Sequence, residues 1–262
     1  RHLVMAGRLL DDDPELAYQY AQVALARGGR VDIVREAAAI TAYATGRYAE
    51  AYREELGIEA AVVVNAAPFA ELEPTPVPDD GPLRLVHAGA ALRNRHLETL
   101  VEATVATSTE ATLDLFLVPN DPGYLAELRA LAAGSDRVRL HDALPYAELV
   151  HWHNDFDLGV HVLPPVSFNN AWALPNKFFD FVQARLGVVV GPSPEMARLV
   201  REHGLGAVAE DFSAKALTAV LDGLTPEGVA GWKRASHTAA RQLSADAQVE
   251  VWRDASRALV PR

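Results

Sequence analysis

The feature that most constrains the fold of this chain is a regular alternation, from residue 83 onward, of short apolar segments with helical patterns. Some of the apolar segments, such as GVVVG at 187–191, have no polar position at all. Strands of this kind are typical of parallel sheets that helices cover on both faces. The pattern predicts an α/β fold, a doubly wound Rossmann-like parallel sheet of about six strands. The expected strands are 83–89, 112–118, 137–141, 156–163, 187–191 and a run that begins at 206.

The predicted domain organisation follows from where this alternation starts and stops. Residues 83–225 form the Rossmann-like domain. The stretch 67–82 is interpreted as a linker, because it has five prolines, several carboxylates and no apolar periodicity. Residues 1–66 are predicted to be a partial α/β portion, which is too short for an independent domain and is therefore truncated or reduced. Residues 226–262 are expected to form two C-terminal helices.

Composition narrows the classes of function. The chain has 24 Lys and Arg against 35 Asp and Glu, a formal net charge of −11, which argues against a broad basic surface for nucleic acid or anionic lipid. Without cysteine there are no disulfides and no thiolate metal sites. No apolar run is long enough for a transmembrane segment, and the start of the sequence lacks a signal-peptide pattern. We therefore expect a soluble, cytoplasmic protein with no nucleic-acid partner.

The nine histidines show no metal-binding pattern. HExxH is absent, and His151 and His153 are two positions apart, so they do not share a helix face. His87 and His161 lie at or near the ends of predicted strands, where packing is favoured over contact with a sugar. No metal site is predicted.

The loop after the first predicted strand has the features of a phosphate site. The strand ends at Gly89, and GAALRNRHLE then opens a helix whose N-terminal N–H groups suit an anion. Arg93 and Arg95 add two fixed positive charges. The alternative is that both arginines are solvated loop residues paired with carboxylates such as Glu98. The dinucleotide fingerprint GxGxxG is absent.

A second polar cluster lies at the start of the helix after the fourth predicted strand. Pro175 suits a first helical turn, and Asn176, Lys177 and Asp180 follow it. Asn176 and Asp180 are four positions apart and share a helix face. The alternative is that Asp180 is a surface acid that stabilises the helix dipole. Since ligands of doubly wound sheets bind at the carboxyl ends of the strands, both clusters lie at the edge where function is expected.

Residues 83–225 resemble the nucleotide-sugar-binding half of GT-B glycosyltransferases, most closely the retaining group called family 4 or group 1. The run GAALRNRHLETLVEA is similar to the family's G-R-L-x-x-x-K-G-x-x-x-L-I-x-A. By this match Gly89 is the loop glycine and Arg95 takes the place of the phosphate-binding lysine. Ala90 stands where the family has an arginine, and Arg93 lies in the same loop.

Two further runs carry the resemblance. LPNKFFDFVQARLGVVV is similar to L-P-N-K-x-F-E-Y-x-A-x-G-x-P-V-V, which puts Asp180 at the glutamate that holds the donor ribose. LHDALPYAELVHWHNDFDLGVHVLP is similar to the segment whose loop receives the donor base. The family's other glutamate, in the loop before Leu-Pro, is absent, and Asn169 and Asn170 stand nearby, where their amides are suited to sugar hydroxyls. Upstream, ATGRYAEAYREELGI and VVVNAAPF look like the end of the acceptor domain.

The resemblance implies a hexosyltransferase-like glycosyltransferase. It would move a sugar from a nucleoside diphosphate sugar to a saccharide, lipid-linked or small-molecule acceptor, with retention and without a metal or other cofactor. A GT-B-like sugar-nucleotide epimerase and an inactive nucleotide-sugar-binding module stay open as alternatives, and the chain by itself is expected to transfer weakly or not at all. The resemblance assigns catalysis to Arg95, Asn170 and Asp180, and donor binding to Gly89, Arg93, Arg95, His141, Asp142, Leu144, Asn169, Asn170, Asn176, Lys177 and Asp180.

Overall fold

The computed structural model describes residues 53–54, 57 and 64–259. The chain divides into two compact units. One consists of Ala66–Pro164 and Pro175–Asp246 and is called the sheet unit below; the other contains Pro165–Leu174 and the chain from Ala247 onward, together with residues up to Asn65. The amino-terminal α/β portion predicted for residues 1–66 lies almost entirely outside the described residues and stays a prediction.

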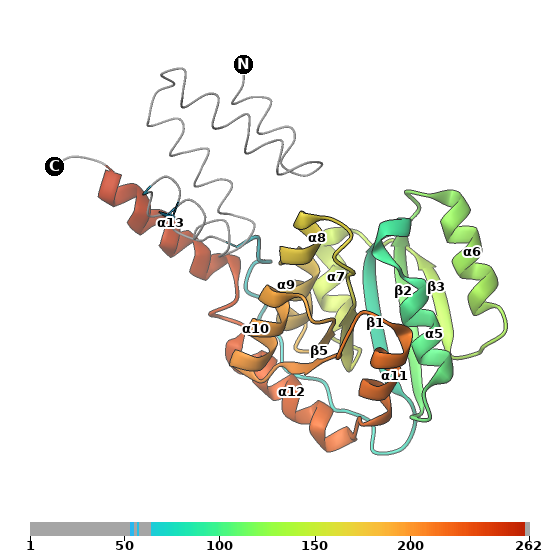
Figure 1. Cartoon of the computed structure of the whole chain (residues 1–262). Helices are drawn as coiled ribbons and strands as arrows, with labels where there is room; N and C mark the ends of the chain where they lie inside the picture. The colour runs from blue at the N-terminus through green and yellow to red at the C-terminus, as the bar shows by residue number, and fades with distance from the viewer. Residues whose placement is uncertain (1–52, 55–56, 58–63, 260–262) are drawn as a thin grey trace, which may run out of the picture. The chain divides into compact units, whose positions relative to one another are not determined.

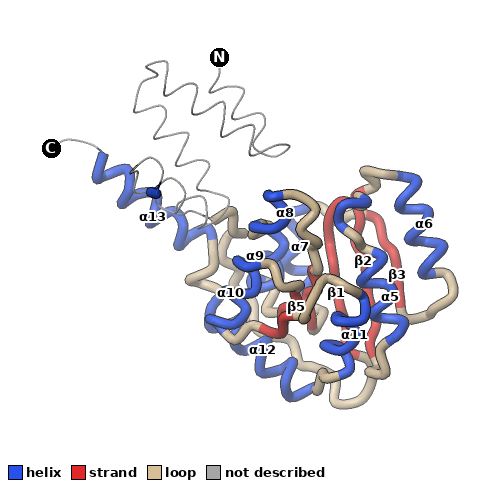
Figure 2. The backbone as a smooth tube through the Cα atoms, in the orientation of Figure 1, coloured by secondary structure: helices blue, strands red, loops and turns tan. Residues whose placement is uncertain are grey.

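A six-stranded parallel sheet forms the centre of the sheet unit (Figures 1 and 2). Its order is β3-β2-β1-β4-β5-β6, so the direction in which strands are added reverses between β1 and β4. This arrangement confirms the predicted doubly wound, Rossmann-like α/β fold, in which a ligand crevice is expected at the carboxyl ends of β1 and β4. The strands are β1 (Leu83–Ala90), β2 (Ala111–Val118), β3 (Val138–Asp142), β4 (Leu158–His161), β5 (Gly187–Val190) and β6 (Gly206–Val208).

Helices follow each strand, as the sequence pattern predicts. Several begin at a capping side chain; Asp121, for example, accepts a hydrogen bond from Tyr124 N at 2.9 Å. Throughout the described ranges, every helix is too short or too polar to span a bilayer. The helices are α5 (Glu98–Ala106), α6 (Pro122–Ala132), α7 (Tyr146–His153), α8 (Phe168–Trp172), α9 (Asn176–Gln183), α10 (Pro194–His203), α11 (Ala214–Asp222), α12 (Pro226–Ala239) and α13 (Ala245–Leu259), with a 3-10 turn η1 (Arg93–Arg95).

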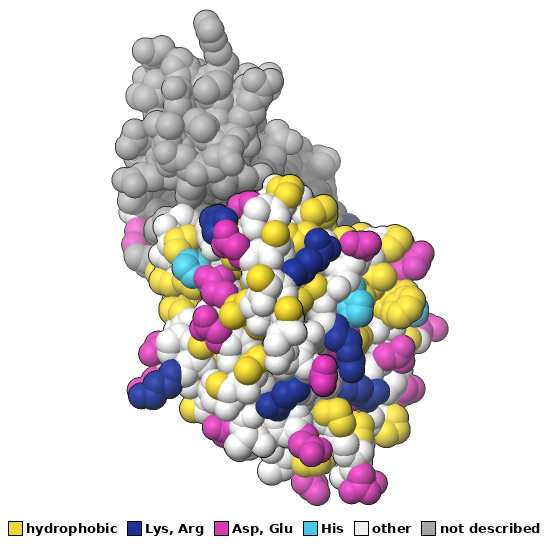
Figure 3. Space-filling view, turned by 90° about the vertical axis from the view of Figure 1, so that its right-hand side faces the viewer, with side chains coloured by type: hydrophobic (Ala, Val, Ile, Leu, Met, Phe, Trp, Pro, Cys, Tyr) yellow, Lys and Arg dark blue, Asp and Glu magenta, His cyan; other side chains and the backbone are white. Residues whose placement is uncertain are grey.

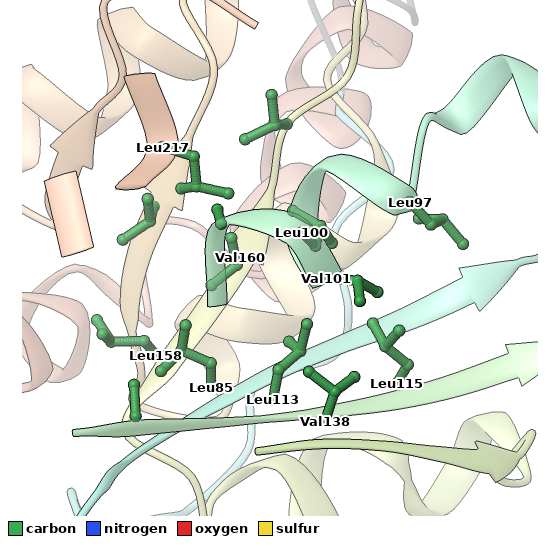
Figure 4. Close-up of a cluster of buried hydrophobic side chains, with 14 of the residues drawn as sticks. Leu85, Leu97, Leu100, Val101, Leu113, Leu115, Val138, Leu158, Val160 and Leu217 are labelled. Atoms are coloured by element: carbon green, nitrogen blue, oxygen red, sulfur yellow. The ribbon is translucent and has the colours of Figure 1, made fainter. Parts of the chain in front are cut away.

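The two faces of the sheet are packed differently. On one face, alternate residues of the strands meet helices α5 and α11, which gives the continuous apolar cluster of Figure 4; its labelled members include Leu85, Leu113 and Leu217. Burying one such leucine contributes about 1.5 to 3 kcal/mol. On the other face, α9 lies so close to β4 that a Cβ on Gly159 would come within 2.2 Å of the Phe181 ring. Glycine at 159 therefore sets how near α9 can approach the strand.

The stretch predicted as a linker has no helix or strand and belongs to the sheet unit. Side chains at the end of α9 and just after it hold this stretch in place. Gln183 Oε1 accepts from Ala70 N at 3.1 Å, and Arg185 Nε donates to Leu72 O at 3.1 Å. The chain that enters β1 is thus fixed against the helix that carries the second predicted cluster.

Candidate nucleotide-sugar site

The carboxyl ends of β1 and β4 bring polar side chains together at the point where the strand order reverses. The strand β1 ends next to Gly89, and the chain then enters η1, which carries Arg95. The strand β4 ends at His161. Lys177 comes from the first turn of α9, which begins without a side-chain cap. The two clusters found in the sequence therefore meet at one edge of the sheet.

Lys177 lies directly against the backbone of Gly89. A Cβ on Gly89 would be only 2.6 Å from Lys177 Nζ, and the φ of Gly89 is 154°. Lys177 Nζ also lies 3.4 Å from His87 Nε2. The other ring nitrogen, His87 Nδ1, lies 2.8 Å from Val160 O. Because a carbonyl can only accept, Nδ1 carries the proton in the neutral ring and Nε2 turns its lone pair to the ammonium.

Positive groups gather here without a nearby carboxylate to neutralise them. Among the described residues, no carboxylate is within ion-pair distance of Lys177 or Arg95. Burial and, to a smaller extent, the charge of Arg95 lower the pKa of Lys177 to about 7, while the charge of Asp180 acts in the opposite direction. Burial, and then the charge of Lys177, hold the pKa of both His87 and His161 well below the usual value, so these rings are neutral. Such an edge can accommodate an anion at little further desolvation cost.

Asp180 is a buried carboxylate one turn further along α9. It is 2% exposed, and its Oδ1 accepts a hydrogen bond of 3.2 Å from the Tyr146 hydroxyl. Burial raises the pKa of Asp180 to about 6, while the bond from Tyr146 and the charge of Lys177 act to lower it. The site thus combines a cationic part around Lys177 with a carboxylate that can accept hydrogen bonds from hydroxyl groups.

The two predicted arginines point to different partners. Arg93 donates two hydrogen bonds of 2.7 Å to Glu127 and lies 3.4 Å from Asp121, so it faces α6. This is the solvated pairing considered as the alternative in the sequence, with carboxylates other than Glu98. Arg95 is half-buried, and burial lowers its pKa. Of the two, Arg95 is the one whose charge acts on Lys177.

His141, Asp142 and Leu144 lie at the end of β3 and in the loop after it. His141 Nε2 is 2.5 Å from Asp114 Oδ1, and its ring stacks on Phe116 at 4.7 Å between centroids. Asp142 is exposed and Leu144 is half-buried. Since β2 separates β3 from β1, these residues flank the cationic part instead of joining it. Their contact with a base stays a prediction.

The three predicted asparagines are divided between the two compact units. Asn176 is the exposed first residue of α9, in the sheet unit. Asn169 and Asn170 lie on α8, in the other unit, where the Ser167 side chain caps the helix by accepting from Asn170 N at 3.1 Å. The contacts of Asn169 and Asn170 with a donor, and the catalytic role of Asn170, stay predictions.

Sequence reasoning did not single out Tyr146, and the histidines that it assigned to packing are buried in the structure. The rings of His87 and His161 are 5.4 Å apart between centroids. Within the described part of the chain, His161 Nε2, both ring nitrogens of His153 and Ser193 Oγ are buried without a hydrogen-bond partner. The signal available for Tyr146 was its position, directly after the loop that follows β3. His161 and Ser193 likewise end or follow strands.

The face of the molecule drawn in Figure 3 carries no continuous basic surface. Positive, negative and apolar side chains alternate over its coloured part. Among the described residues, no group of three or more His, Cys, Asp or Glu side chains is arranged so that it could hold a metal ion.

Comparison with known proteins identifies the fold. No protein-family model and no curated protein matches the chain. Several solved structures are similar to the chain. A pneumococcal O-GlcNAc transferase, GtfA, in complex with UDP and GlcNAc is similar with a TM-score of 0.57 at 14% identity, over 81% of this chain and 43% of that one.

Two further solved structures are similar. The lipopolysaccharide-biosynthesis glycosyltransferase WaaG has a TM-score of 0.54 at 14% identity, over 79% of this chain and 61% of its own. The S. aureus protein TarM, in complex with UDP, has 0.59 at 11% identity, over 81% and 42%. The chain thus spans less than two thirds of the length of each of these proteins. It has the GT-B glycosyltransferase fold.

Proposed function

We propose that this chain is the donor-binding portion of a glycosyltransferase that moves a sugar from a nucleoside diphosphate sugar to an acceptor. The observation that carries the proposal is the position of Lys177 and Arg95. Both are cationic, both lack a nearby carboxylate within the described residues, and both lie at the β1 and β4 ends of a sheet with the GT-B fold. UDP in the GtfA and TarM complexes is consistent with such a donor.

The chemistry follows from the charges of the site. When the bond between the sugar and the diphosphate breaks, negative charge accumulates on the leaving phosphate oxygens. Lys177, Arg95 and the positive end of α9 are fixed donors for that charge, and a partly dry site strengthens their effect. Asp180 accepts the ribose hydroxyls, and Gly89 admits the ammonium beside the strand. Arg93 is paired with Glu127 and is left out of the proposed diphosphate contacts, and sugar contacts of Asn169 and Asn170 stay a prediction from the sequence.

The finer parts of the proposal are the class and the partners. We assign the chain to the retaining family 4 or group 1 type, acting as a hexosyltransferase without a metal, in the cytoplasm, on a saccharide, lipid-linked or small-molecule acceptor. In this proposal the described portion binds the donor.

Calorimetry on the full chain tests this function. UDP, GDP, ADP and inorganic pyrophosphate are titrated in turn, and at least one nucleoside diphosphate is expected to bind. Arg95→Ala should weaken that binding about tenfold, because a charge-assisted contact is lost. Arg129→Ala is the matched control, since Arg129 is exposed on α6 away from the strand ends.

Three results would count against the proposal. If no nucleoside diphosphate binds to the wild-type chain, the function is wrong. If Arg95→Ala and Arg129→Ala bind alike, the assignment of Arg95 is wrong. If the bound nucleotide sugar is rearranged in the absence of an acceptor, an epimerase replaces the transferase.

A further inference from the structure

Tyr146 is an exposed aromatic residue that is hydrogen-bonded to a buried carboxylate. It is the first residue of α7 and is 56% exposed, whereas Asp180 is 2% exposed. The hydroxyl donates to Asp180 Oδ1 at 3.2 Å. A large exposed side chain normally samples several rotamers, so a polar anchor at its tip places the ring beside the carboxylate. The pair connects α7 to α9, which pack against each other.

Few groups stabilise the ionised form of the Asp180 carboxylate. Burial disfavours the carboxylate, and the two groups that oppose burial are Tyr146 on α7 and Lys177 on α9. The charge of Lys177 acts instead on His153 of α7 and His161 of β4, where it lowers the pKa of both rings after burial. β5 has no titratable side chain, and on α12 Lys233 is bound to Thr75 Oγ1 and Phe156 O.

We propose that Tyr146 is a positioning residue for the donor ribose: its hydroxyl holds the Asp180 carboxylate in the ionised form and orientation that accept the ribose hydroxyl groups. This inference rests on the proposed function. An ionised carboxylate accepts through both oxygens, whereas a protonated one spends an O–H as a donor and pairs less well with two hydroxyls. Tyr146 therefore acts on the nucleoside and leaves the diphosphate to Lys177 and Arg95.

Removing the Tyr146 hydroxyl should affect binding of the nucleoside but not binding of the diphosphate. In Tyr146→Phe the Asp180 carboxylate loses a donor, so its pKa should rise above the wild-type value of about 6. Near pH 6.5 more of the variant is then protonated. Binding of a nucleoside diphosphate should weaken about threefold to tenfold at that pH. The deficit should shrink as the pH rises toward 8, since Asp180 ionises again, and the affinity for inorganic pyrophosphate should not change.

The experiment is calorimetry on the full-length wild type, Tyr146→Phe and Trp152→Phe at several pH values, with pyrophosphate and the nucleoside diphosphate that binds the wild type. Trp152→Phe is the matched control, because Trp152 is 49% exposed near the other end of α7. Carboxyl NMR of Asp180 in wild type and Tyr146→Phe gives a second readout. The inference predicts a raised Asp180 pKa together with a pH-dependent loss confined to the nucleotide.

Two outcomes overturn it. One is an Asp180 that titrates identically in the wild type and Tyr146→Phe. The other is a binding deficit that is the same at every pH or is shared by pyrophosphate. If the wild-type chain binds no nucleoside diphosphate, the proposed function and this inference both fall; if it binds one and the variant behaves like the wild type, only this inference falls.

Discussion

The positive charge of Lys177 lowers the stability of the fold but favours the binding of an anion. In the unfolded chain a lysine keeps its proton up to its usual pKa of 10.5, whereas burial lowers the pKa of the folded side chain to about 7. The unfolded state therefore binds more protons between these values, and stability rises with pH across that range. Below pH 7 the cost of the half-buried ammonium is fully present. A charge kept at such a cost is expected where an anion is bound.

The affinity for a nucleoside diphosphate should have a maximum between about pH 6 and about pH 7. Affinity rises as Asp180 ionises near 6 and falls as Lys177 loses its proton near 7. Inorganic pyrophosphate has no ribose, so its profile should lack the contribution of Asp180 and keep the fall at high pH. Lys177→Met should remove that fall while lowering affinity. Calorimetry from pH 5.5 to 8.5 measures all three, and a flat profile for the wild type would contradict the assigned roles.

At the scale of the element, α9 is positioned by a glycine on the neighbouring strand. A Cβ at residue 159 would lie 2.2 Å from Phe181 Cγ, and the ring is fully buried. Gly159→Ala should therefore push α9 from β4, lower the free energy of unfolding by about 2 kcal/mol and weaken nucleotide binding, because α9 carries Lys177 and Asp180.

The control for this change is Gly134→Ala, at a glycine with nothing within 4 Å of the added atom. It should alter stability by less than about 0.5 kcal/mol. Urea denaturation compares the two variants. Equal stabilities for them would show that the contact between α9 and β4 is not as tight as described.

The sequence predicted the elements better than their side-chain directions. Strands such as 187–191 are apolar at every position and flanked by helical patterns, which is why all six were found. The turn η1 and helix α8 have three and five residues, too few for a helical period to be visible. Arg93 and Arg95 are equivalent in the sequence, yet one faces Glu127 and the other is half-buried. That difference depends on the 3-10 turn η1, which is too short to give a hydrophobic period in the sequence.

In the sheet unit, Lys233 at the amino ends of the strands has an ion-pair partner, whereas Lys177 at the carboxyl ends has none among the described residues. At the amino ends, Asp157 accepts from Arg84 at 2.8 Å and lies 3.5 Å from Lys233, so each buried charge has a partner. At the carboxyl ends, Lys177 has a neutral histidine as its nearest partner. A buried ion that is paired serves the fold, whereas the half-buried ammonium of Lys177, which has no ion-pair partner among the described residues, is available to a ligand.

This contrast could not be read from the sequence, because Lys177 and Lys233 are both single lysines in helices that pack on the sheet. What the sequence did give was position: Lys177 follows β4 and Gly89 ends β1, and parallel strands bring their carboxyl ends together. The proximity of the two clusters followed from the topology. The contacts of Lys177 with Gly89 and His87 required the structure.

A structure of the full chain with a bound nucleoside diphosphate shows directly whether Lys177 and Arg95 hold the donor. We expect the diphosphate within hydrogen-bond distance of Lys177 Nζ and the Arg95 guanidinium, with the ribose hydroxyls at Asp180. A diphosphate bound away from the ends of β1 and β4, for example beside Arg93 and α6, would contradict it.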